Sequence, residues 1–148
     1  MKLLVITALV PFADTLAGRT GHALVAALRA AGHTAEMLPV PHDASRPDRL
    51  EESMLVWRSL RLSNIDGVIA LGFPACLVIG PAKTVWMDDV PVPPAGAAAA
   101  RAGFAEARRV FAASPAIAAR LLADTRFDAP VLPPLPADWG ATLAALLP

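Results

Sequence analysis

The sequence predicts an α/β fold: a Rossmann-like three-layer sandwich with a mainly parallel sheet of about six strands, in a single domain over residues 1–148. Three observations carry this prediction. Short apolar runs of strand length alternate with segments whose apolar residues recur at helical spacing. Helices between strands imply right-handed crossovers between parallel strands. Finally, 55% of the 148 residues are apolar, which is enough to build a packed core.

The first half of the chain is expected to supply three strands and two helices. "KLLVITAL" is a continuous apolar run, and we expect Lys2 to Ala8 to form a strand at the centre of the sheet. From Thr20 to Ala31 the apolar residues share one helical face, and Gly32 suits the position after a helix. "TAEMLPV" is the second strand. Ser45 and Pro47 begin the next helix, and "GVIAL" is the third strand.

The second half continues the alternation. A loop with one helical turn leads to the strand "TVWM", and the alanine-rich residues 97–100 favour a helix. "RRVFAA" fits either a strand or a helix end. Ser114 and Pro115 form a strong helix start, and that helix runs to Ala123. "APVLPPL" is the last predicted strand, and Asp138 caps a tail helix.

Charge and cysteine content exclude several functional classes. Basic and acidic residues balance at 13 each, so no net field favours nucleic acid or an anionic membrane. The single cysteine, Cys76, excludes an internal disulfide framework and indicates a reducing, cytoplasmic location. No apolar run approaches the ~20 residues of a transmembrane helix. The apolar start "MKLLVITALVPF" fits a first strand better than a signal peptide, because no small-residue cleavage site follows.

Common cofactor and metal motifs are missing. "AGRTGH" is not GxGxxG, no GxxxxGK[ST] occurs, and His22, His33 and His42 lack ligand spacing. We therefore expect no metal and no cofactor. A phosphoreceiver domain needs acidic residues directly after the first strand, where this chain has "LVP".

Ligands of open α/β sheets bind at the carboxyl ends of the strands, where the strand order reverses. Four segments should meet there: Pro11 to Arg19, Leu71 to Pro74, the pair Asp88 and Asp89, and the turn at 113–114. Helix starts at this edge also offer free backbone N–H groups.

Four segments in order carry a family resemblance: "MKLLVITALVPF", "LVAALRAAGHTAEMLPVP", "ESMLVWRSLRLSNIDGVIALGFPACLVIGPAKTVWM" and "EARRVFAASPAIAARLLADTRFDAPVLPPL". With them the chain resembles the N-terminal half of a GT-B glycosyltransferase, of the kind grouped in glycosyltransferase family 4. The most specific features are "GH" after the first helix, "FPA" followed by "V..GP.K.VW", and "RRVFA.S" followed by "VLPPL". In such enzymes this half binds the acceptor and the other half binds the nucleotide sugar.

The chain also departs from the family pattern. It stops just after "VLPPLP", so the family's donor-holding residues have no counterpart here. Thr15-Leu16 stands where relatives carry a Gly-Gly pair. Asp88-Asp89 and "VPVPP" follow "TVWM", where relatives have a His-rich segment and a long insertion.

By resemblance, Asp88 occupies the position of a catalytic cleft residue, and Asp14, Arg19, Phe73 and Asp89 would bind the acceptor. A structural alternative remains open, in which Asp88 caps the next turn, Asp89 is solvated and Phe73 shapes its loop. Because the insertion is missing, we expect a partly collapsed cleft with Asp88 near the loop after the first strand.

Three functions remain. In the first, the chain is an acceptor-side half that binds a sugar acceptor, is inactive alone and needs a separate donor-binding half. An apolar patch with Trp139, Leu143 and Leu147 in the tail helix is then a candidate docking surface. Alternatively, it is a non-catalytic binding or scaffold domain that can form a homodimer. The third possibility is a small enzyme that acts on an unrelated ligand in the same cleft.

Overall fold

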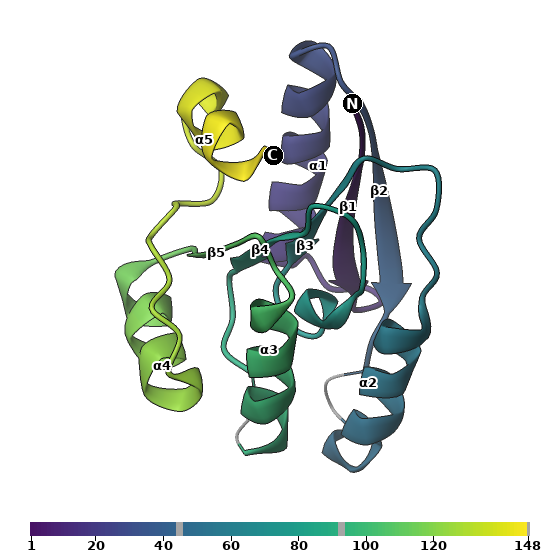
Figure 1. Cartoon of the computed structure of the whole chain (residues 1–148), viewed down its shortest axis with the longest axis vertical. Coiled ribbons are helices and arrows are strands. Elements are labelled where there is room, and N and C mark those ends of the chain that lie inside the picture. Colours follow the sequence, from purple (N-terminus) through teal and green to yellow (C-terminus); the bar gives the residue numbers. More distant parts are fainter. Residues whose placement is uncertain (44–45, 92–93, 148) are drawn as a thin grey trace.

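A computed structural model describes residues 1–43, 46–91 and 94–147, and in this part of the chain helices cover both faces of one sheet (Figure 1). The strands are β1 (Lys2–Leu9), β2 (Thr34–Pro41), β3 (Gly67–Leu71), β4 (Thr84–Met87) and β5 (Arg109–Ala112). The helices are α1 (Leu16–Ala30), α2 (Leu50–Ser59), α3 (Ala95–Ala105), α4 (Pro115–Thr125) and α5 (Trp139–Leu146), with 3₁₀ turns η1 (Pro47–Arg49) and η2 (Ala75–Leu77). The predicted fold class is confirmed.

All strands described in the sheet are parallel, in the order β2-β1-β3-β4-β5. The sheet has five of these strands and not six. The expected sixth strand, "APVLPPL", makes only one bridge, between Val131 and Ala112. Pro130, Pro133 and Pro134 in this segment have no N–H to donate, so the ladder cannot extend. β1 is an interior strand, but β3 and not β1 lies at the centre.

Side-chain caps set the helix starts. The Thr15 hydroxyl accepts the Gly18 N–H at 3.1 Å, so α1 begins at Leu16 and not at Thr20 as expected. Ser114 caps α4 as predicted, and Asp138 caps α5. Ser45 lies outside the described residues, and "RRVFAA" contains a strand.

Each face of the sheet has its own core. α1 and α5 cover one face around Trp86, while α2, α3 and α4 lie on the other, around Trp57 and Phe104 (Figure 1). Leu143 and Leu146 of α5 are buried in the first of these cores. The tail helix is therefore part of the domain's own core, and the expectation of a docking patch there is wrong for Leu143.

The contact between α3 and η2 is unusually close. A Cβ built on Gly103 would lie 2.5 Å from the backbone oxygen of Cys76. The same oxygen accepts a 3.1 Å hydrogen bond from Lys83 Nζ, which also donates to the Val78 oxygen at 2.9 Å. Lys83 is only 2% exposed, and these carbonyls replace the water that its ammonium loses on burial. Glu106, 3.6 Å away, supplies a negative charge.

Both ends of the chain lie at the amino edge of the sheet. The Met1 carbonyl accepts the Thr34 N–H at 2.9 Å where β1 and β2 begin. At the start of β5, Arg109 Nη1 donates to the carbonyls of Ala145 and Leu147 at 2.6 and 2.7 Å. The N and C marks of Figure 1 accordingly lie on the side of α1 and α5, away from α2, α3 and α4.

Candidate functional site

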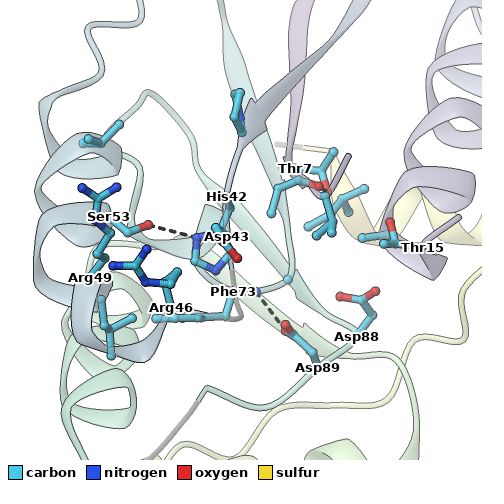
Figure 2. A pocket seen from close by; sticks show the side chains of 18 of the residues that line it. Thr7, Thr15, His42, Asp43, Arg46, Arg49, Ser53, Phe73, Asp88 and Asp89 are labelled. Carbon is cyan, nitrogen blue, oxygen red and sulfur yellow. Dashed lines mark hydrogen bonds between the residues drawn. The ribbon is translucent and has the colours of Figure 1, made fainter. Parts of the chain in front are cut away.

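A cavity of about 480 Å³ opens at the carboxyl edge of the sheet, between the ends of β1 and β3 (Figure 2). β1 pairs with β2 on one side and β3 on the other, so the strand order reverses at this point. The volume falls within the range of small-molecule sites, about 300–1,000 Å³. The expectation of a collapsed cleft is therefore wrong. Of the "VPVPP" segment, residues 92–93 lie outside the described residues.

One wall of the cavity carries the two aspartates that follow β4. The Phe73 backbone N–H donates to Asp89 Oδ1 at 2.9 Å, which ties this carboxylate to the loop after β3. Gly72 lies directly against the pair: a Cβ at this position would be 2.6 Å from Asp88 Oδ1 and 3.3 Å from Asp89 Oδ1. Its φ of +71° is also a conformation that favours glycine. The sequence placed Phe73, Asp88 and Asp89 at one site, and the structure brings them together.

The two carboxyl groups have unusual acidities. Loss of water contact raises the pKa of Asp89 to about 7, and the charge of Asp88 adds to the rise. Desolvation also raises the pKa of Asp88, which the backbone N–H groups of Asp88 and Ala17 oppose. Asp89 as a residue is exposed, and it lines the cavity. Asp89 therefore titrates near neutral pH within reach of a ligand.

Asp89→Asn is expected to flatten the pH dependence of the free energy of unfolding. With a folded pKa of about 7 and a reference value of 3.8, folded Asp89 binds more protons than unfolded Asp89 between these values. Stability from this group is therefore present at low pH and lost as pH rises towards 7. Asparagine does not titrate, yet its amide oxygen can still accept the Phe73 N–H.

The measurement is urea unfolding followed by tryptophan fluorescence from about pH 4 to about pH 8. Asp124→Asn, on α4, makes the same chemical change outside the cavity and serves as the matched control. Parallel pH curves for wild type and Asp89→Asn would show that the Asp89 pKa is not raised.

The opposite wall carries a histidine that the sequence did not single out as functional. His42 follows β2, and its Nδ1 lies 3.0 Å from the Ser53 hydroxyl of α2 (Figure 2). Burial lowers the pKa of His42, against the opposing charge of Asp43, and so favours the neutral imidazole. Both side chains line the cavity and can exchange hydrogen bonds with a ligand. Its sequence position could have identified it, because His42 directly follows a predicted strand and so lies at the carboxyl edge of the sheet.

Asp14 and Arg19 do not join this site. They pair with each other across 3.5 Å, with side chains 73% and 56% exposed, and neither lines the cavity. The turn at 113–114 also lies outside its lining, and Ser114 acts as a helix cap. Cys76 is buried, and desolvation raises the pKa of its thiol, which argues against a nucleophilic role.

Comparisons with known proteins add no family. Neither a scan against protein-family models nor a search of curated proteins finds a match to this chain. Within residues 1–43, 46–91 and 94–147, no helix is long and apolar enough to cross a membrane. In the same described ranges, no group of three or more His, Cys, Asp or Glu side chains is placed to hold a metal ion.

Proposed function

We propose that this protein is the acceptor-side half of a GT-B type glycosyltransferase and binds a hydroxyl-bearing acceptor in the cavity at the carboxyl edge. The observation that carries the proposal is the carboxylate pair, Asp88 and Asp89, on the wall of a cavity of about 480 Å³. The cavity lies where open α/β sheets bind their ligands. The sequence resemblance supplies the reaction class.

In this proposal Asp89, and not Asp88 as the resemblance implied, accepts the proton of the acceptor hydroxyl. A general base works best when its pKa lies near the working pH, and the pKa of Asp89 is about 7. The Phe73 N–H fixes one carboxylate oxygen. Asp88 faces the Ala17 N–H at the start of α1 and has a positioning role beside it.

The isolated 148-residue chain is expected to bind simple hexoses but to transfer no sugar from a nucleotide sugar. Acceptor binding alone does not lower the barrier, because the donor must also be held in the transition state. Amide chemical shifts followed during hexose titration should change saturably at residues 7–19, 42–56 and 71–90, and a transfer assay should give no product.

Two results would count against the proposal. Saturable shifts with a nucleoside monophosphate alone would indicate a nucleotide-binding domain instead. Hexose-dependent shifts confined to residues outside the cavity would remove the acceptor site. A non-catalytic binding domain predicts the same hexose binding, and it differs in gaining no activity when donor-binding halves of GT-B transferases are added.

A further inference from the structure

Charges are unevenly distributed around the cavity. Its described lining includes four carboxylates and two guanidinium groups: Asp43, Glu52, Asp88, Asp89, Arg46 and Arg49. Arg49 is the last residue of η1 and Arg46 directly precedes this turn, and both lie opposite the aspartate pair (Figure 2). Both signs of charge are therefore present, and the partners of each group decide which charge a ligand meets.

Both guanidinium groups already have carboxylate partners. Arg46 donates two hydrogen bonds to Asp48, at 3.1 and 3.0 Å, and Arg49 lies 3.5 Å from Glu52. These pairs are exposed, and exposed ion pairs contribute little to stability. An anionic ligand that binds either arginine would share the guanidinium group with this carboxylate.

The aspartate pair has no such partner. Within the described residues, no ion pair involves Asp88 or Asp89, and the hydrogen bonds they accept come from backbone N–H groups. Their oxygens flank one point beside Gly72. Two carboxylates that face one cavity repel each other, and a cation between them would relieve that repulsion.

A second, separate cavity also borders Asp88. The Thr20 hydroxyl is buried without a hydrogen-bond partner, in a residue only 3% exposed. It lines a cavity of about 10 Å³ that Asp88 also lines. This volume is close to the minimum for one water molecule, which could satisfy the Thr20 hydroxyl.

We propose that the cavity selects a hydroxyl-bearing ligand with a protonated amine, the class of amino sugars and aminocyclitols, and holds the ammonium group at Asp88, beside the hydroxyl group whose proton Asp89 accepts. The inference rests on the proposed acceptor site and names the class of acceptor. An ammonium group has three donors and no acceptor, which matches carboxylate oxygens. Its hydrogen bonds to carboxylates are about twice as strong as neutral ones. His42 and Ser53, on the opposite wall, can exchange hydrogen bonds with the other hydroxyl groups of the ligand.

The test compares three ligands that differ only at carbon 6: 6-amino-6-deoxyglucose, glucose and glucose 6-phosphate. Titrations are followed by amide shifts at about pH 8, where a primary amine is protonated. We expect the amine to bind at least about tenfold more tightly than glucose, and the phosphate more weakly than glucose. Asp88→Asn and Asp89→Asn should each reduce the amine-to-glucose ratio several-fold. Asp124→Asn should keep it, because this matched charge change lies on α4.

The outcomes separate this inference from the proposed function. Equal binding of amine and glucose overturns the amine preference and leaves the acceptor site intact. Tightest binding of the phosphate also overturns it, and shows that Arg46 or Arg49 binds the phosphate. If none of the three ligands gives saturable shifts at the cavity, both this inference and the proposed acceptor site are wrong.

Discussion

Replacement of Gly72 by alanine is expected to abolish ligand binding in the cavity and to destabilise the fold by about 2–3 kcal/mol. Gly72 has a φ of +71°, and a side chain in the left-handed region costs about 1–2 kcal/mol. The new methyl group would also lie 2.6 Å from Asp88 Oδ1, so the carboxylate must move. Moving Asp88 disturbs the wall to which the ligand is proposed to bind. Urea unfolding and hexose titration measure the two effects separately.

Gly32→Ala is the matched control. Gly32 has a φ of +85°, but a Cβ there would meet no atom within 4 Å. It should therefore show the backbone strain alone, about 1 kcal/mol, with unchanged ligand affinity. If both variants lose the same stability and both still bind the ligand, Gly72 does not hold the two aspartates in place.

Gly103→Ala is expected to destabilise the protein by about 3 kcal/mol. Its methyl group would lie 2.5 Å from the Cys76 oxygen, and backbone atoms cannot move aside as a flexible side chain can. Moving this carbonyl would weaken its hydrogen bond to the buried Lys83 ammonium. The better helix propensity of alanine offsets at most about 1 kcal/mol of this destabilisation. Equilibrium unfolding in urea provides the measurement.

A second glycine of α3 is the comparison for this variant. A Cβ on Gly96 would have its nearest contact at 3.5 Å, an ordinary van der Waals distance. Gly96→Ala should leave stability unchanged or raise it by up to about 1 kcal/mol. Equal stabilities for the two variants would mean that α3 can shift away from η2 at no cost.

The sequence predicted the fold where local signals were strong. Apolar runs such as "GVIAL" are buried on both faces, which is typical of central parallel strands. Ser114 and Asp138 cap helices through their own side chains, so their local signal was sufficient. Predictions that required tertiary contacts were less accurate. The order of the strands depends on pairing across the sheet, and "APVLPPL" pairs only once because proline removes donors.

The sequence predicted the location of the candidate site better than it predicted which side chains form it. Parallel strands bring the loops after β1, β3 and β4 to one edge, and this topology placed Phe73, Asp88 and Asp89 together. Asp14 lies farther from its strand end, and Arg19 lies in α1, so the direction of these side chains depends on contacts that no local pattern encodes. They pair with each other outside the cavity. The burial of Lys83 was not predicted either, because its partners are backbone carbonyls, and their position around the ammonium group depends on the folded loop.

The position of the chain ends has a practical consequence. Met1 and Leu147 are held at the amino edge of the sheet, while the cavity opens at the carboxyl edge. An affinity tag, a fluorescent label or a surface linker attached at either end would therefore leave the cavity mouth accessible. For biosensor work the protein can be immobilised through its termini with the binding face turned towards the flowing solution. Lysine coupling would give the same orientation, because Lys2 is exposed at the amino edge and Lys83 is buried.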